Sequence, residues 1–125
     1  MDMLLRCQIV MKIHIDTLDK LFSQYIKLRD KVCQRCGGNN GLQTAHFYGR
    51  ARHSVRYDPD NACLLCFGCH RYLDSNPIEK TEFFQKRLGE EGFAFLQVRK
   101  EMPGKDIDRE AIKLYLKAKI LELHE

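Results

Sequence analysis

The sequence lacks any apolar stretch close to the roughly 20 residues that a membrane-spanning helix needs. Internal repeats and low-complexity tracts are absent as well. Residues 1–16 are apolar but interrupted by charges, and they do not have the layout of a signal peptide. We therefore expect no membrane partner and a reducing compartment, the cytoplasm, where disulfides are rare.

The size and charge of the chain set further bounds. Its 125 residues are enough for one domain with a modest core, which a bound metal would help to stabilise. The formal net charge of +4 and the pI of about 8.8 permit a nucleic-acid partner without requiring one. No motif that reads base edges is evident, so contacts with DNA should be mainly to phosphate and sugar.

Two pairs of cysteines with identical spacing lie in the middle of the chain, Cys33-x-x-Cys36 and Cys66-x-x-Cys69. A Cys-x-x-Cys turn, called a zinc knuckle, points two sulfurs at one place, and two knuckles complete a tetrahedral shell. Disulfides would require an oxidising compartment, and a redox role is typical of a single pair. The spacing therefore predicts a structural Zn²⁺ site with four thiolate ligands.

The second knuckle could also be formed by Cys63 and Cys66, which have the same spacing. Cys63 lies in the apolar run 62–65, where it would pack as a small hydrophobic side chain. We therefore prefer Cys69 as the fourth ligand, and we expect Cys7 to be a free thiol.

The cysteines enclose a strand–loop–strand–helix unit. Strand-like residues occupy about 42–48 and 62–65, and His70 is expected to open the helix that follows. The pattern predicts a small α+β domain in which zinc joins the base of a hairpin to a helix. The expected parts of this single domain, residues 1–125, are a scaffold helix at 17–32, a zinc-stapled core at 33–76 and C-terminal helices at 77–125.

The flanking segments show helical periodicity. Asp16 or Thr17 can cap the first helix and Asp106 can cap the last, while Gly89 should interrupt the helical segment between them. The last helix has an apolar stripe so wide that it should be buried on more than one side. Either the N-terminal helix or a second copy of the chain, in a homodimer, would cover it.

Three residues of the core have the types and the order that phosphodiester hydrolysis requires. Hydrolysis needs a base for water, a divalent ion to neutralise the phosphate and the leaving oxygen, and a rigid support. His46, at the end of the first strand, can be the base when a backbone carbonyl fixes its other ring nitrogen. His70 can hold the ion from the facing helix, and Asn61 can tie the intervening loop to the backbone.

This pattern resembles that of the HNH nucleases, the ββα-metal group, and more closely that of the phage NinG (Rap) recombination proteins. The resemblance extends over residues 17–90. The matching residues are Leu21-Phe22-Ser23, Lys27-Leu28-Arg29-Asp30, Cys33, Cys36, Ala45-His46-Phe47, Arg50, Arg56, Asp60-Asn61, Cys66, Cys69, Tyr72-Leu73 and Ser75-Asn76.

The resemblance implies a ββα-metal fold and a metal-dependent DNA endonuclease. His46 would be the general base, Asn61 the loop asparagine and His70 a ligand of Mg²⁺ or Mn²⁺. Many HNH enzymes carry a second metal ligand just before the base, where this chain has Ala45. Asp74 lies four residues after His70 and could supply that ligand, although a solvated or capping aspartate is commoner. The NinG proteins are associated with branched recombination intermediates, which implies structured DNA as substrate.

Four arginines lie in or beside the loop that should face the substrate: Arg50, Arg52, Arg56 and Arg71. Guanidinium groups bind phosphate oxygens in pairs, so we expect these side chains to contact the DNA backbone. An alternative is a non-catalytic zinc-ribbon DNA-binding module, in which Ala45 marks a lost metal site. A protein-interaction adaptor that uses the helical ends as its surface is a third interpretation.

Overall fold

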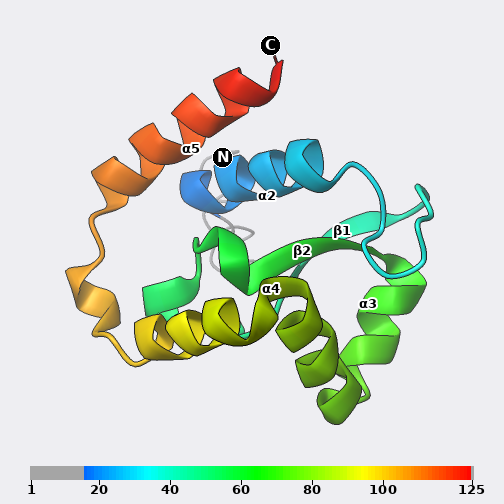
Figure 1. Ribbon diagram of the computed structural model, residues 1–125. Coiled ribbons are helices and arrows are strands. Elements are labelled where there is room, and N and C mark those ends of the chain that lie inside the picture. Colours follow the sequence, from blue (N-terminus) through cyan, green and yellow to red (C-terminus); the bar gives the residue numbers. More distant parts are fainter. Residues whose placement is uncertain (1–15, 125) are drawn as a thin grey trace, which may run out of the picture.

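The computed structural model describes residues 16–124, so Cys7 lies outside the described part (Figure 1). The architecture is the small α+β arrangement that the sequence predicts. None of the described helices is both long and apolar enough to cross a bilayer. The elements are α2 (Thr17–Asp30), β1 (Leu42–His46), the 3-10 turns η1 (His53–Val55) and η2 (Pro59–Asn61), β2 (Ala62–Cys66), α3 (Phe67–Asp74), α4 (Pro77–Lys100), η3 (Gly104–Asp106) and α5 (Arg109–His124).

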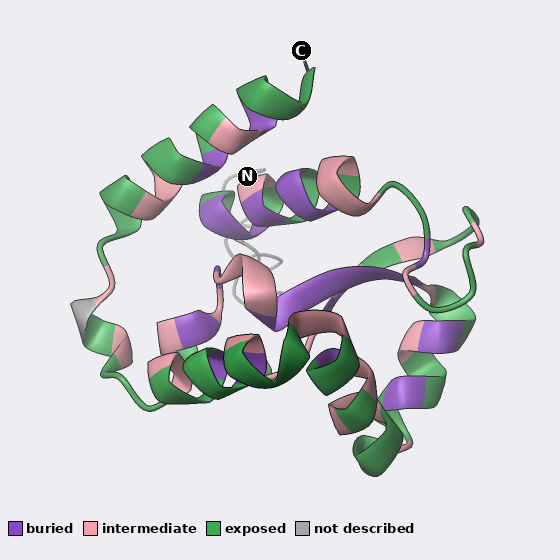
Figure 2. Ribbon diagram, viewed as in Figure 1, coloured by how far each residue is buried: buried purple, intermediate pink, exposed green. Residues whose placement is uncertain are grey.

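The two strands form an antiparallel hairpin that is covered on both faces. Thr44 pairs with Leu64 and Ala45 with Cys63, so neighbouring residues of each strand point to opposite faces. Leu64 packs in a cluster with side chains of α2 and α5, whereas Ala45 and Cys63 pack in a second cluster with α3 and α4. Because both faces are covered, β2 is buried along almost its whole length, as its colour in Figure 2 shows.

Helix α2 begins at Thr17 because the preceding residue caps it. The carboxylate of Asp16 accepts a hydrogen bond from the backbone N–H of Asp19 at 2.8 Å. The carboxylate of Asp19 accepts one from the backbone N–H of Asp16 at 3.1 Å, which completes a capping box. The buried apolar side chains of the helix pack toward the sheet and α5; they are Leu18, Phe22, Tyr25 and Ile26.

A buried carboxylate at the end of α2 ties this helix to the hairpin and to α4. Asp30 accepts hydrogen bonds from the Arg29 side chain at 2.8 Å, from the Arg87 side chain at 3.1 Å and from the backbone N–H of Leu64 at 2.9 Å. Burial alone would raise the pKa of Asp30, but these hydrogen bonds and positive charges lower it overall. The ionised carboxylate therefore joins three separate segments of the chain.

Helix α3 begins at Phe67, three residues earlier than the sequence analysis placed it. Cys66 is its N-cap, and its sulfur accepts a hydrogen bond from the backbone N–H of Cys69 at 3.4 Å. The second zinc knuckle is thus the first turn of the helix, since a sulfur acceptor satisfies a free N–H of that turn. The prediction that His70 opens the helix is wrong, and His70 lies inside it.

Helix α4 bends at Gly89, where the sequence predicted a break. Gly89 has φ 78° and ψ 166°, a conformation that residues with a side chain rarely adopt. Figure 1 shows the two halves of α4 meeting at an angle. The bend lets both halves reach one cluster, since Phe84 before it and Phe93 after it are buried together.

Helix α5 begins at Arg109 and is capped by Asp108, whose carboxylate accepts a hydrogen bond from the backbone N–H of Ala111 at 3.0 Å. The sequence predicted a cap at Asp106, and this prediction is wrong. Asp106 belongs to the short turn η3, which precedes the helix and moves its start by two residues.

A narrow part of the apolar stripe on α5 is buried. Leu116 and Ile120 pack against α2, beside which α5 lies in Figure 1. Leu114 and Leu121 remain 68% and 66% exposed. Burial against the N-terminal helix is therefore confirmed for one side of the stripe, and pairing with a second copy of the chain stays a prediction.

The bend of α4 can be tested with two glycines of the same helix. Gly89→Ala should lower the free energy of unfolding by about 1–3 kcal/mol, because alanine is strained at this backbone conformation. Its Cβ would meet no atom within 4 Å, so steric contact does not contribute. Gly92→Ala should be neutral or stabilising by up to about 1 kcal/mol, and urea unfolding measures both. Equal effects of the two substitutions would contradict the bend.

Candidate metal centre and cleft

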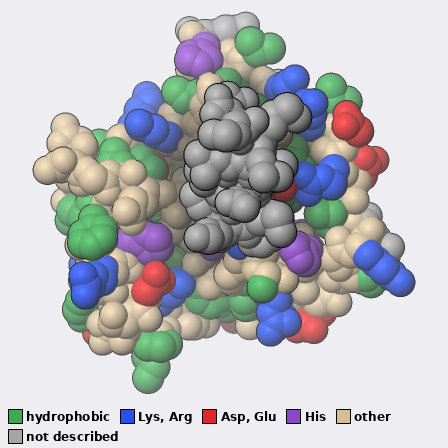
Figure 3. Space-filling model, turned by 180° about the vertical axis from the view of Figure 1, so that it is seen from behind, with side chains coloured by type: hydrophobic (Ala, Val, Ile, Leu, Met, Phe, Trp, Pro, Cys, Tyr) green, Lys and Arg blue, Asp and Glu red, His purple; other side chains and the backbone are tan. Residues whose placement is uncertain are grey.

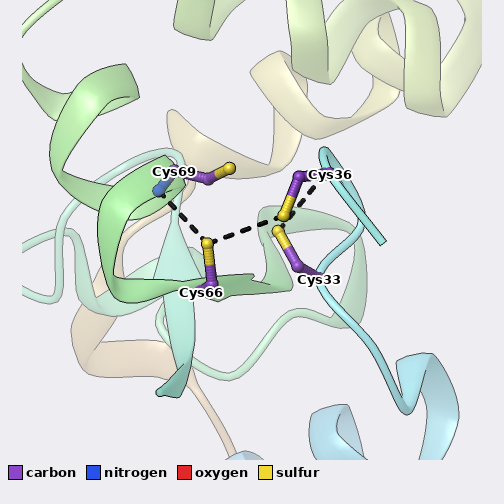
Figure 4. Close-up of side chains that lie close together, drawn as sticks. All are labelled: Cys33, Cys36, Cys66 and Cys69. Atoms are coloured by element: carbon purple, nitrogen blue, oxygen red, sulfur yellow. Dashed lines mark hydrogen bonds between the residues drawn. The ribbon is translucent and has the colours of Figure 1, made fainter. Parts of the chain in front are cut away.

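The four cysteines of the two knuckles converge on one point between β2, α3 and the loop after α2 (Figure 4). The sulfurs of Cys33, Cys36, Cys66 and Cys69 all lie within 4.8 Å of one another. Sulfurs placed about 2.3 Å from a tetrahedral zinc ion lie roughly 3.8 Å apart. The Cys36 and Cys66 sulfurs are 3.7 Å apart, so the cluster can hold a structural zinc ion.

Hydrogen bonds to sulfur favour the thiolate form that a metal requires. The Cys33 sulfur accepts one from the backbone N–H of Cys36 at 3.5 Å, and the Cys69 sulfur accepts one from the Arg35 side chain at 3.4 Å. Burial opposes ionisation, yet backbone N–H donors lower the pKa of Cys33 to about 6. Burial raises the pKa of Cys69 to about 12. Four neighbouring thiolates need a cation among them, because their negative charges repel one another.

The alternative ligand Cys63 is not a member of this group of four sulfurs. It is fully buried opposite Ala45, on the face of the hairpin that packs with Leu65 and Phe84. Burial raises the pKa of the Cys63 thiol to about 12, which is typical of an inert core cysteine. The arrangement supports Cys69 as the fourth ligand and Cys63 as a core residue.

A cleft of about 380 Å³ lies beside β1. Both His46 and His70 line it, so the fold brings together the two histidines that the sequence analysis singled out. The remaining lining residues come from α2, β1 and the loop after it, α3 and the start of α4. They are Asp19, Phe22, Ser23, Thr44, Gly49, Arg50, Asp74 and Lys80.

His46 has the tautomer that a general base requires. Its Nε2 is 3.0 Å from the backbone carbonyl oxygen of Arg56, and because that oxygen can only accept, Nε2 carries the proton. The lone pair is therefore on Nδ1. No described group hydrogen-bonds Nδ1, and no buried polar side-chain atom of the described residues lacks a partner, so Nδ1 is open to solvent.

The surroundings of His46 keep its ring neutral. Burial lowers the pKa of His46 below the ordinary histidine value of 6.5, and the positive charges of Arg50 and Arg56 lower it further. The ring packs on Phe22, with the two centroids 5.5 Å apart. The neutral form is the one that can take a proton from water.

His70 is oriented by a residue that the sequence analysis missed. Its Nδ1 is 2.7 Å from Oε1 of Gln43, which can only accept, so Nδ1 carries a proton. Nε2 is 3.3 Å from a carboxylate oxygen of Asp74, one helical turn later. The other carboxylate oxygen of Asp74 is 2.8 Å from the ammonium of Lys80. His70 and Asp74 thus lie side by side on α3, and their role as metal ligands stays a prediction.

Asn61 is fully buried and holds the loop between the strands. Its side-chain oxygen accepts a hydrogen bond from the N–H of Tyr48 at 2.8 Å, and its amide donates to the carbonyl oxygens of Tyr48 and Val55, both at 3.0 Å. These bonds occupy the backbone of Tyr48, which explains why β1 ends at His46 instead of residue 48. Asn61 performs the tethering that the sequence analysis expected, and it does not line the cleft.

The four predicted DNA-binding arginines have different surroundings. Arg50 lines the cleft, and one of its terminal nitrogens is 4.0 Å from the Asp19 carboxylate. Arg52 and Arg71 are exposed. Arg56 is largely buried and binds Asp19 through two side-chain hydrogen bonds, which join the loop to the start of α2. Figure 3 shows basic side chains dispersed among acidic and apolar ones on the face that it presents.

The cleft residues that were not predicted have only weak signals in the sequence. Gln43 and Lys80 are polar residues in a strand and a helix, and such residues are usually solvated. Their contacts with His70 and Asp74 depend on how α3 and α4 pack beside β1. Asp19 carries a recognisable signal, because its spacing from Asp16 is that of a capping box, but this spacing does not indicate its contact with Arg56.

A family model described as "Bacteriophage Lambda NinG protein" matches residues 8–125. The chain belongs to the NinG family. The match confirms the closer of the two resemblances and extends it through α5, beyond the residues that carried it in the sequence. No curated protein and no solved structure matches this NinG-family chain, so the wider HNH relationship stays a prediction.

Zinc binding by the NinG-family chain can be tested at two cysteines of β2. Cys66→Ala should release the metal and lower the midpoint of urea unfolding, because three thiolates leave the tetrahedral shell incomplete. Cys63→Ala, three residues away, should retain one zinc ion per chain, since Cys63 lies in the core. Metal analysis of the purified proteins measures both. Zinc retained in Cys66→Ala and lost in Cys63→Ala would reverse the assignment.

The neutral state of His46 predicts a pH dependence. In an NMR titration of the folded chain the His46 ring should protonate below pH 6.5, whereas in the chain unfolded by urea it should titrate at about 6.5. Because the pKa is lower in the folded chain, the stabilising contribution of neutral His46 is present above pH 6.5 and is lost as pH falls through the folded pKa. A folded pKa above the value in urea would contradict the geometry.

Proposed function

We propose that this NinG-family chain is a metal-dependent DNA endonuclease of the HNH type. The observation that carries the proposal is the shared cleft, in which His46 offers a neutral imidazole and His70 faces a carboxylate. The two histidines come from different elements, β1 and α3, that the cysteine cluster holds at the base of the hairpin. A base and a cation site that line one cleft suit the hydrolysis of a phosphodiester bond.

His46 would act as the general base. Its Nδ1 is open to solvent and carries the lone pair, because Nε2 is occupied by the Arg56 carbonyl. A water molecule in the cleft would give its proton to Nδ1 while its oxygen attacks the phosphorus. The imidazolium that forms would be stabilised at Nε2 by the Arg56 carbonyl, which the arginine's binding to Asp19 helps to hold in place.

His70 and Asp74 would hold a divalent cation, Mg²⁺ or Mn²⁺. Adjacent ligands of an octahedral Mg²⁺ ion, each about 2.1 Å from it, lie roughly 3 Å apart. The His70 nitrogen and the Asp74 oxygen are separated by 3.3 Å, which fits this arrangement, and Gln43 directs the lone pair of Nε2. Such an ion would neutralise the phosphate and the departing 3′ oxygen, and water and phosphate oxygens would complete its shell.

Arginine side chains would bind the DNA backbone beside the cleft. Arg50 suits this role best, because it lines the cleft and its contact with Asp19 is a loose one of 4.0 Å. Arg52 and Arg71 are exposed and free to reach neighbouring phosphates. Arg56 would support the loop, since Asp19 engages it. The family resemblance suggests branched recombination intermediates or other structured DNA as substrate.

A non-catalytic zinc-stapled DNA-binding module is the second candidate, and two observations favour it. Ala45 points into the core beside Cys63, so position 45 cannot supply the ligand found in many HNH enzymes. Lys80 also pairs with Asp74 and would compete with a cation there. This candidate predicts DNA binding that weakens with salt, without cleavage in the presence of any divalent ion.

A cleavage assay separates the two candidates. With Mn²⁺ and supercoiled plasmid or branched DNA, the wild-type chain should cut, and His46→Ala should cut at least about 100-fold more slowly, because the base is lost. His53→Ala is the matched control, since His53 is exposed, lies in the same loop region and does not line the cleft. Zinc content and circular dichroism verify that all three proteins are folded.

The outcomes of this assay are distinct. Equal cutting by the wild type and His46→Ala would contradict the role of His46. Salt-sensitive DNA binding without cutting by any of the three proteins would support the binding module instead.

A further inference from the structure

Phe67 is a large aromatic side chain that the fold leaves in solvent. It is 55% exposed, although it directly follows the buried strand β2. The guanidinium carbon of Arg71, one helical turn later, is 6.0 Å from the centroid of the Phe67 ring, at the outer limit of a cation–π contact. One spot on the surface therefore combines an apolar ring with a positive charge.

The position of Phe67 is fixed by its neighbours. Cys66, immediately before it, is the N-cap of α3 and a member of the cysteine cluster. The loop that follows the first cysteine pair also lies against the Phe67 side chain, because a Cβ built on Gly41 would be 3.6 Å from the Cβ of Phe67. A ring on such a rigid support loses little conformational entropy when it stacks on a ligand.

Phe67 is on the same helix as two residues that line the cleft. His70 and Asp74 follow it by three and seven residues, so all three occupy one face of α3. Neighbours at this spacing on a helix have Cβ atoms about 5–6 Å apart. A strand whose phosphate lies at His70 would therefore bring an adjacent nucleotide to Phe67, since successive nucleotides are about 3.4 Å apart when stacked and farther apart when extended.

We infer that Phe67 and Arg71 form a stacking site for an unpaired nucleobase next to the cleft, an inference that rests on the proposed function. Paired bases inside a duplex bury their faces against their neighbours, so only an unpaired or unstacked base can cover the Phe67 ring. The Arg71 guanidinium binds the phosphate of that nucleotide or stacks on the base itself. The site selects DNA by the presence of an unpaired base and does not read its sequence.

The test measures binding without turnover, in a His46→Ala background. The probes are a single strand and a gapped duplex that carry 2-aminopurine at an unpaired position, and a fully paired duplex of the same length. Removal of the ring in Phe67→Ala should weaken binding of the two unpaired probes by about tenfold or more and leave the paired duplex within twofold. Phe67→Trp should restore affinity and quench the 2-aminopurine fluorescence by stacking.

The control is Phe95→Ala on α4, which removes an equally exposed phenylalanine, 58% accessible, that does not line the cleft. This substitution should leave the affinity for all three probes unchanged. Equal weakening for paired and unpaired probes, no weakening in Phe67→Ala, or no binding of any probe would overturn the stacking site. The nuclease proposal is judged separately by cleavage with the wild-type chain. If Phe67→Ala, with His46 intact, still cuts DNA and the substitution leaves probe binding unchanged, the stacking site is contradicted and the nuclease proposal is not.

Discussion

The convergence of four sulfurs at the base of the hairpin is the constraint on which the cleft depends. Cys33 and Cys36 follow α2, whereas Cys66 and Cys69 join β2 to α3, so the cluster fixes the helix that carries His70 relative to the hairpin that carries His46. A two-stranded hairpin is at best marginally stable in water. Metal binding by the four thiolates would therefore stabilise the arrangement of the two histidines as well as the fold.

The residues that could be predicted from the sequence are those whose side-chain chemistry and spacing allow few other roles. Cys33, Cys36, Cys66 and Cys69 form a cluster because their spacing matches zinc geometry, whatever the surrounding packing. His46 meets the Arg56 carbonyl because a histidine at a strand end lies beside the loop that returns to the sheet. Such features depend on short stretches of chain, which spacing alone can identify.

Residues whose roles depend on packing could not be predicted. Helix α3 begins at Phe67 because the knuckle itself is a helical turn, and no local signal distinguishes that from a separate turn before His70. Gln43 orients His70 across 27 positions of sequence, a contact that exists only once α3 lies beside β1. The wide stripe of α5 is also ambiguous, because α2 covers one side and leaves Leu114 exposed.

The charges in the cleft explain how a site with few ligands could still bind a cation and a phosphate. Among the described residues that line it, Asp74 is paired with Lys80, and Asp19 with Arg56 and more loosely with Arg50. A divalent ion at the Asp74 oxygen that faces His70 would leave the other oxygen to Lys80, so one carboxylate would then face both cations. The ion would add two positive charges beside His70, close to the ammonium of Lys80. Phosphate and cation would then bind cooperatively, since each removes an electrostatic cost of binding the other.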